Sequence, residues 1–309
     1  MSASSCRACG GALAAWREVA AGEPDDPRRF QLLRCESCGS AVTAGDPPGA
    51  EAYETGVYAP GPPRALPAVR ALQAATVGQP IRILRRTGTR RGARVLDAGA
   101  GSGRLVEALA DAGFAAEGLE PSARSAGLAQ AAGRAVRRQR IEDHNDAGVD
   151  AVVLWHVLEH LDDPLPVLEH VRGWLRPGGR LLVGVPNIDS DQARIAGAGW
   201  LHLDVPRHRS HFTPAGLDAL LRRSGLEPLT THHTVWEHNP AGMWMALLTR
   251  AGMAPGLPFH LLKRNARARP VDVALLAAGV PLLPVAVAME LFAAASRHGG
   301  TIAAVAARP

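Results

Sequence analysis

The sequence predicts an α/β protein in which a mainly parallel sheet is covered by helices on both faces, with a small cysteine-rich unit in front of it. Between residues 94 and 185, apolar strand-like runs alternate with helix-like segments, and short joints connect them. The first run leads into "DAGAGSG", a turn with three glycines at alternate positions, which is typical of a backbone that approaches a nucleotide-like ligand. Four cysteines near the N-terminus form two C-x-x-C pairs. These observations predict a ligand-binding domain built on a sheet, with a small metal-binding unit at its N-terminus.

Residues 1–44 are predicted to form a zinc ribbon. Each C-x-x-C pair is followed by a glycine, which lets backbone amides turn toward the sulfurs, and the 25 residues between the pairs leave room for strands at 14–20 and 28–34. Four thiolates suit one tetrahedral zinc ion and leave it no open position, so the expected role is structural. The alternative is a set of redox dithiols or disulfides. The predicted ligands are Cys6, Cys9, Cys35 and Cys38.

Composition and charge do not indicate a nucleic-acid partner. The chain has 309 residues and a formal net charge of +5, and Lys263 is its only lysine. The arginines are scattered rather than gathered into one run, which fits a compositional bias as well as a binding surface. The N-terminus has no apolar stretch of the signal-peptide kind, so we expect a cytoplasmic location, where structural disulfides are rare.

The predicted elements follow the order of a doubly wound sheet. Residues 45–88 form a Pro- and Gly-rich connector and a leading helix at 69–88, and the main domain spans 89–309 with an apolar helical insertion at 237–298. Strands are predicted at 94–97, 115–120, 134–138, 149–155, 180–185, 226–233 and 301–308. Helices are predicted at 103–112, 122–132, 164–175 and 213–225, the last with a threonine cap and a proline at its first position.

The glycine turn does not match a dinucleotide fingerprint. That fingerprint, G-x-G-x-x-G, needs its third glycine where Arg104 stands, and no phosphate loop ending in G-K-[ST] is present. An NAD(P)-dependent oxidoreductase is therefore the alternative rather than the leading interpretation. Asp97, just before the turn, suits a ligand with an ammonium group, and Glu120, at the end of the next strand, can accept both hydroxyls of a ribose.

Four motifs in fixed order, "VLDAGAGSG", "GLEP", "DAVVLWHVLEHLDDP" and "LRPGG", resemble the class I S-adenosylmethionine-dependent methyltransferases. The resemblance covers residues 90–235 and returns at the final strand. It implies a Rossmann-like seven-stranded sheet whose last strand is antiparallel, with S-adenosylmethionine at the carboxyl ends of the first strands. A second alternative is a non-catalytic binding module on a degenerate domain of this kind. The implied cofactor contacts are Asp97, Gly99, Ala100, Gly101, Gly103, Glu120, Pro121, Ile141, Glu142, Trp155 and His156.

Arg140 and two tyrosines lie near the implied cofactor site in the sequence. Many relatives carry an acidic residue before the adenine contact, whereas this chain has Arg140. Tyr53 and Tyr58 lie in a segment that related methyltransferases often fold over the cofactor, although packing of the connector is an equal alternative.

Transfer of a methyl group to a hydroxyl needs a base, and histidine suits that role near neutral pH. "WHVLEH" resembles the Glu-x-x-Glu-His segment that ubiquinone-biosynthesis O-methyltransferases associate with a divalent ion, but His156 replaces its first glutamate. Glu159 and His160 are expected to brace the loop. In the segment 200–214, His208 is the favoured base. His156 and His211 are further catalytic candidates, and His211 is also expected to cap the following helix.

Residues 271–296 are unusually apolar, with 17 uncharged residues between Asp272 and Glu290. A membrane span is not expected, because the strand after it must return to the sheet. The two prolines in the middle, at 281 and 284, and the basic segment before it predict a helical hairpin that packs beside the acceptor pocket or contacts a membrane through 257–296. A homodimer interface is equally compatible. The expected acceptor is a small molecule that is methylated on oxygen; a lipid-linked and a sugar-containing metabolite are two options among others.

Overall fold

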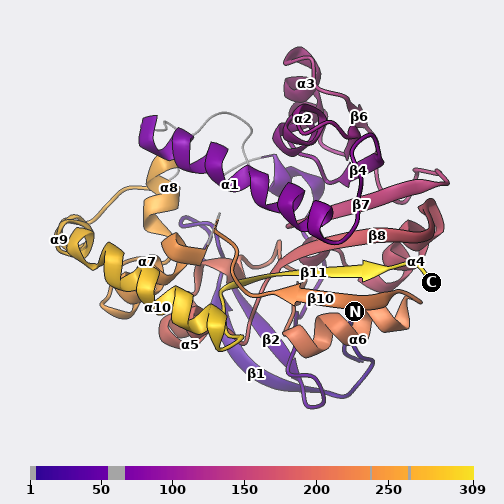
Figure 1. Cartoon of the computed structure of the whole chain (residues 1–309). Coiled ribbons are helices and arrows are strands. Elements are labelled where there is room, and N and C mark those ends of the chain that lie inside the picture. Colours follow the sequence, from indigo (N-terminus) through magenta and orange to yellow (C-terminus); the bar gives the residue numbers. More distant parts are fainter. Residues whose placement is uncertain (1–4, 55–66, 237–238, 264–265) are drawn as a thin grey trace.

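The computed structural model describes residues 5–54, 67–236, 239–263 and 266–309 (Figure 1). The described residues contain a seven-stranded sheet and a four-stranded sheet. The larger sheet runs in the order β10-β11-β8-β7-β4-β5-β6. Its strands are β4 (Arg94–Ala98), β5 (Ala115–Glu120), β6 (Val136–Arg138), β7 (Val149–Trp155), β8 (Leu175–Pro186), β10 (Glu227–His232) and β11 (Thr301–Ala307).

The topology confirms the predicted sheet. β11 is antiparallel to both of its neighbours, β8 and β10, while β8, β7, β4, β5 and β6 run parallel. The chain order reverses between β4 and β7, and such a switch point leaves a crevice at the carboxyl ends of the strands. β8 is longer than predicted, because the turn "RPGG" is itself part of the strand rather than a break before it.

Alternate residues of the strands pack against opposite layers of helices. Val152 and Leu154 face α4 (Pro164–Trp174) and α6 (Pro214–Arg223), whereas Ala151 and Val153 face α1 (Pro67–Arg86) and α2 (Arg104–Asp111). The helix α3 (Ala123–Ala131) covers β5 and β6. Both faces of the central strands are therefore buried, which explains their continuous apolar runs.

The four-stranded sheet joins the N-terminal ribbon to the main domain. It contains β1 (Leu13–Ala20), β2 (Arg29–Cys35), β3 (Ala41–Thr43) and β9 (Ser210–His211), in that order. β9 belongs to the segment 200–214 that contains the favoured base His208, and it pairs with β3 in antiparallel register, Ala41 with His211 and Val42 with Ser210. Two residues of the loop thus complete the sheet of the ribbon.

The apolar insertion is not the predicted hairpin. It contains α7 (Asn239–Arg250), α8 (Leu257–Lys263), α9 (Pro270–Gly279), the 3₁₀ turn η6 (Val280–Leu282) and α10 (Leu283–Ala295). α9, η6 and α10 follow one another without an intervening loop, and both helices pack on α7. Pro281 and Pro284 each stand in the first turn of a segment, where a missing amide costs no hydrogen bond, so they redirect the helical run without ending it.

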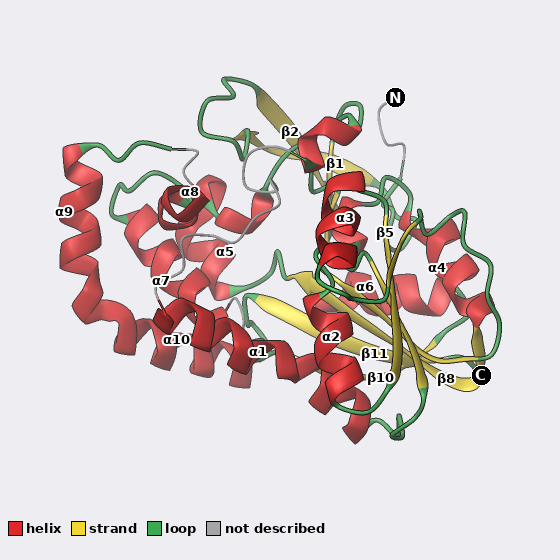
Figure 2. Cartoon of the chain, turned by 90° about the horizontal axis from the view of Figure 1, so that it is seen from above, coloured by secondary structure: helices red, strands yellow, loops and turns green. Residues whose placement is uncertain are grey.

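Figure 2 shows that this run turns a corner at the edge of the molecule, so that α9 and α10 point in different directions. By length and composition alone, residues 270–295, whose most apolar 18-residue window has a mean hydropathy of 2.1, would suffice to cross a membrane. However, β10 and β11, before and after the insertion, are neighbours in one sheet. A crossing would separate them.

Candidate active site

The glycine turn after β4 forms one wall of a cavity of about 540 Å³, a size common in small-molecule sites. Its φ angles are +91° at Gly99, +52° at Gly101 and +74° at Gly103, a region that residues with a side chain rarely adopt. The amides of Gly99 and Ala100 donate to the carbonyl oxygen of Leu119 at 2.8 and 2.9 Å, which fixes the turn to the end of β5. Of the predicted cofactor contacts, Asp97, Gly99, Ala100 and Trp155 line this cavity.

Two carboxyl groups flank the turn. Asp97 is only 3% exposed, and burial, followed by the negative charge of Glu120, raises the pKa of its carboxyl to about 7. Glu120 accepts hydrogen bonds from the amides of Gly101 and Ser122, both at 2.8 Å. A buried carboxylate beside an open cavity suits a cationic group, and a pre-oriented one keeps lone pairs for hydroxyls.

Several other predicted cofactor residues do not line this cavity. The side chain of Ile141 is buried in the core, and Glu142 is exposed and pairs with Arg140 at 3.3 Å. Pro121 is exposed, and Gly103 precedes α2. Because neither Ile141 nor Glu142 lines the cavity after β4, the adenine contact stays a prediction.

The connector contacts both the cofactor edge and the histidine loop. The Oγ of Ser122 donates to Glu54 at 3.2 Å. The hydroxyl of Tyr53, in the turn η1 (Ala50–Tyr53), donates to the carbonyl of Arg207 at 3.3 Å, and its ring meets that of His160 edge-on at 5.5 Å. Tyr58 lies outside the described residues.

His156 follows Trp155 directly at the carboxyl end of β7, with a φ of +56° that residues other than glycine seldom adopt. Its Nδ1 lies 3.0 Å from Oε1 of Glu159, which is 1% exposed. Burial opposes ionisation of Glu159, but the hydrogen bond and charge of His156, together with the charge of His160, lower its pKa to about 2. The ionised carboxylate therefore orients the imidazole. The sequence signal for this pair is its i, i+3 spacing, whereas the expected bracing pair was Glu159 with His160.

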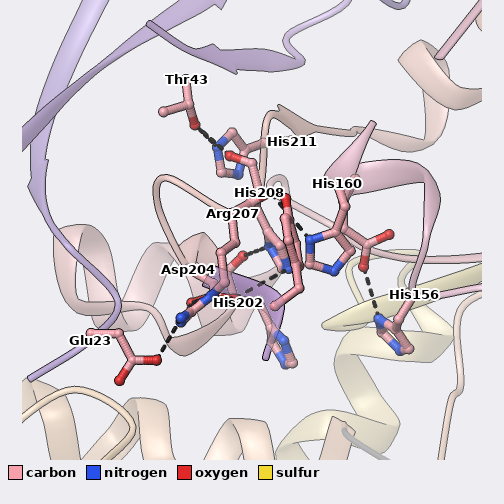
Figure 3. Close-up of polar contacts among 11 residues, drawn as sticks. Glu23, Thr43, His156, His160, His202, Asp204, Arg207, His208 and His211 are labelled. Carbon is pink, nitrogen blue, oxygen red and sulfur yellow. Dashed lines mark hydrogen bonds and ion pairs between the residues drawn. The ribbon is translucent and has the colours of Figure 1, made fainter. Parts of the chain in front are cut away.

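A second group of histidines lies in the loop 200–214 and next to it (Figure 3). His208 lies with its ring 4.6 Å from that of His160, its Nδ1 donates to the carbonyl of His202 at 2.8 Å, and its Nε2 is 3.8 Å from Asp204. Burial, followed by the charge of His208, lowers the pKa of His160 to about 4, so that His160 is neutral near pH 7. Glu159, His160 and His208 each offer one possible metal-ligand atom, and these atoms lie within 4.8 Å of one another.

His211 ties this loop to the ribbon. Thr43 donates its hydroxyl to the carbonyl of His208 at 2.6 Å, so that His211 Nε2, 2.9 Å away, is the donor to Thr43. Burial, followed by the charge of His208, lowers the pKa of His211 to about 3. The expectation that His211 caps the next helix is wrong: Thr213 caps α6, accepting from the amide of Gly216 at 3.0 Å, because its short hydroxyl reaches the first turn.

A second cavity, of about 790 Å³, lies between the ribbon, the loop and the insertion. It is lined by the ribbon turn 20–26, by parts of 198–204, and by residues of the segment 254–267. At its rim, Arg207 pairs with Asp204 and, at 2.5 Å, with Glu23 of the ribbon turn (Figure 3). Burial opposes ionisation of Asp204, but the hydrogen bond from Arg207 lowers its pKa to about 2. This wall is therefore charged and fixed.

The four cysteines converge on one point. The Sγ atoms of Cys6 and Cys38 are 3.7 Å apart, those of Cys9 and Cys35 are 3.4 Å apart, and all four lie within 4.8 Å of one another as free thiols. Four sulfurs at about 2.3 Å from a tetrahedral zinc would be about 3.8 Å apart. Amide donors from Cys38 and Ser37 outweigh burial and lower the pKa of Cys35 to about 7. The donor set and its spacing fit a zinc ribbon.

Comparison with known proteins decides the family. Residues 72–231, just over half of the chain, match a family model described as a methyltransferase domain. The chain belongs to this methyltransferase family. Its fold and family are those of the class I S-adenosylmethionine-dependent methyltransferases, as the motifs implied, and not those of an NAD(P)-dependent oxidoreductase. Two features separate the two interpretations: Arg104 stands where the dinucleotide fingerprint needs its third glycine, and β11 is antiparallel to its neighbours.

Known relatives of this methyltransferase include ubiquinone biosynthesis O-methyltransferases. The protein of that name from Xylella fastidiosa (strain 9a5c) is 36% identical over 150 residues, which cover 44% of this chain and 61% of the relative. That from Dinoroseobacter shibae is 33% identical over 176 residues, covering 52% and 69%. The chain thus spans about three fifths of the length of the first relative.

Solved structures show the same fold. A chain of the complex between the Haloferax volcanii Trm112 methyltransferase activator and a methyltransferase has a TM-score of 0.52 and 18% identity, covering 78% of this chain and 94% of that one. A methyltransferase from Archaeoglobus fulgidus has a TM-score of 0.50 and 15% identity, covering 76% and 94%. At these identities the likeness concerns the fold alone.

The conformation of Gly99 in the glycine turn leads to a testable prediction. An alanine at position 99 would combine a φ of +91° with a Cβ 2.3 Å from Cγ2 of Val157. We expect Gly99→Ala to weaken S-adenosylhomocysteine binding at least tenfold in calorimetry and to cost about 2–3 kcal/mol of stability. Gly88→Ala is the matched control, since Gly88 has a φ of +97° and nothing within 4 Å of the added Cβ. Equal binding by both variants would show that the close approach at Gly99 is unimportant.

Proposed function

We propose that the protein transfers a methyl group from S-adenosylmethionine to a hydroxyl of a small-molecule acceptor, with His156 as the base. The observation that carries this proposal is the His156–Glu159 pair, 3.0 Å apart and one residue beyond Trp155, which lines the cavity of the glycine turn. A hydroxyl must lose a proton as it is methylated, whereas bound S-adenosylmethionine supplies a reactive methyl group that needs no acid. The names of the relatives, O-methyltransferases, support the same acceptor chemistry.

His156 fits the base better than His208, which the sequence favoured. Glu159 holds Nδ1 of His156, so Nε2 is the nitrogen that takes the proton, and the buried carboxylate stabilises the imidazolium that results. His208 instead gives its Nδ1 hydrogen to a backbone carbonyl and is 5% exposed. His211 is bonded to the ribbon. We assign these two histidines to positioning the loop.

Asp97 and Glu120 hold the two ends of the cofactor in this proposal. Asp97 takes the ammonium group and Glu120 the ribose hydroxyls, while the glycine turn allows the close approach of the ligand. The enzyme then contributes alignment of the acceptor oxygen and exclusion of water. Glu159 is buried and His160 and Asp204 are partly buried, which supports a site from which water is largely removed.

We further propose that one structural zinc ion occupies the cysteine cluster and that the second cavity receives the acceptor. The zinc proposal rests on the sulfur spacing, and four thiols of this kind favour the reducing cytoplasm. The acceptor cavity combines Trp200, Leu203 and Leu257 with the carboxylates of Glu23 and Asp204. Such a lining suits an acceptor with hydroxyls on one side and an apolar part on the other, as in a lipid-linked or sugar-containing metabolite.

Replacement of His156 by glutamine tests the base. With methyl-labelled S-adenosylmethionine and a panel of phenols, polyols and prenylated hydroxyl compounds, we expect His156→Gln to lower kcat about 10²–10⁴-fold while S-adenosylhomocysteine binds within threefold of the native affinity. Glu159→Gln should shift the pH profile, because the imidazolium loses its counter-charge. The control His232→Gln changes a histidine at the end of β10. A label found on nitrogen or carbon, or a His156→Gln enzyme of native kcat, refutes the proposal.

A further inference from the structure

The outer surface of the insertion is apolar, and no other part of the described chain covers it. Only 17% of the most apolar 18-residue window within 270–295 is buried. Of the large hydrophobic side chains that are exposed in the described residues, most belong to this run, and Phe292 is 73% exposed. Exposed apolar patches of this kind mark sites of interaction.

The exposure is greatest at the corner. All six residues from Val280 to Val285, "VPLLPV", are apolar and exposed. By contrast, α10 buries Ala286 and Ala293 against Met243 of α7, so the helix is anchored by one side and presents the other. Figure 2 shows the corner at the rim of the molecule, away from the sheet.

The charges of the run are arranged in a way that favours one kind of partner. Its two acidic residues, Asp272 and Glu290, are 1% and 2% exposed, so they do not charge the surface. Arg269 is bound to Asp272. At the two ends, Arg267 and Arg297 are exposed. The apolar surface thus carries no exposed acid and is flanked by positive charge.

We propose that the corner 280–285 and the adjoining faces of α9 and α10 dock on the surface of an anionic membrane. The apolar corner enters the boundary between headgroups and acyl chains, and the flanking arginines meet the anionic headgroups. A second copy of the chain fits less well, because either orientation of two such surfaces would bring positive ends together. The second cavity lies at the end of α9 opposite the corner, since Ala266 and Arg267 line that cavity and precede α9.

Vesicle flotation of the full chain tests this proposal, independently of methyl transfer. We expect binding to vesicles of phosphatidylcholine with 30% phosphatidylglycerol that is at least tenfold stronger than binding to pure phosphatidylcholine and weakens with salt. The triple variant Leu282→Ser, Leu283→Ser, Val285→Ser should lose that binding, and Arg267→Gln should weaken it. The control Leu128→Ser, Leu229→Ser changes two leucines of similar exposure, 43% and 45%, on α3 and β10.

Two further measurements distinguish loss of membrane binding from misfolding and from a change of oligomeric state. S-adenosylhomocysteine binding by each variant reports whether the sheet domain is folded, and light scattering after gel filtration reports its oligomeric state. Native cofactor binding with loss of vesicle binding in the corner variant alone supports the proposal. A native protein that ignores anionic vesicles, or a dimer that the corner substitutions split, overturns it in favour of a protein interface.

Discussion

Asp97→Asn is expected to abolish measurable binding of S-adenosylhomocysteine, with a loss of at least 100-fold, or about 3 kcal/mol. The carboxylate is buried beside the cavity, and an amide of the same shape removes its charge while leaving the packing unchanged. The ammonium group of the ligand would then be desolvated against a neutral partner. Calorimetry with the purified chain measures the change directly.

The same residue predicts the pH dependence of the native enzyme. Burial, and then Glu120, raise the pKa of Asp97 to about 7 in the empty site, so that the proton competes with the cationic ligand below that pH. The affinity for S-adenosylhomocysteine should be constant above pH 7 and fall by about tenfold per unit below it. Asp111→Asn, at another acid lining the cavity, should keep this profile. Binding by native protein that does not change between pH 5.5 and 8 would contradict the assignment.

Cys35→Ser is expected to remove the zinc and, with it, the order of the ribbon. Structural zinc contributes about 10 kcal/mol or more to small domains of this kind, and a hydroxyl in place of one thiolate leaves an incomplete site. The metal content should fall from one zinc per chain to none. Because β3 pairs with β9, and Thr43 holds the carbonyl of His208, the loop 200–214 should lose its order too.

Two readouts separate this effect from general unfolding. Methyl transfer should be lost while S-adenosylhomocysteine still binds, because the glycine turn is attached to β5 and not to the ribbon. Ser37→Ala, an exposed change between Cys35 and Cys38, should keep zinc and activity. A native protein without zinc, or a Cys35→Ser chain whose residues 200–214 resist protease as before, would be inconsistent with the proposed role.

The sheet domain could be predicted because its signals are local. Each strand is a buried apolar run, so the strands could be located from the sequence itself. The antiparallel last strand and the cofactor edge were implied by the resemblance to class I methyltransferases. Asp97, Gly99 and Trp155 line one cavity at this edge of the sheet, and their contact with the cofactor stays a prediction.

The features that were not predicted depend on contacts between distant segments. β9 is two residues long and has no apolar periodicity of its own; it is a strand only because β3 lies beside it. Likewise, the corner at Val280 follows from the packing of α10 on α7, whereas the two prolines alone were equally consistent with a hairpin. The choice between His156 and His208 depends on the partner of Nδ1, which is a carboxylate for His156 and a backbone carbonyl for His208.

The pairing of β3 with β9 also constrains how the chain is made. Ala41 can meet His211 only after a further 170 residues have been synthesised, which at ribosomal rates takes roughly 10–30 s. Throughout that interval the exposed edge of β3 has no strand to pair with. Until then the N-terminal strands have only the pairing of β1, β2 and β3 with one another. In the zinc-bound form that we propose, early capture of the metal would protect the nascent ribbon from mispairing and oxidation.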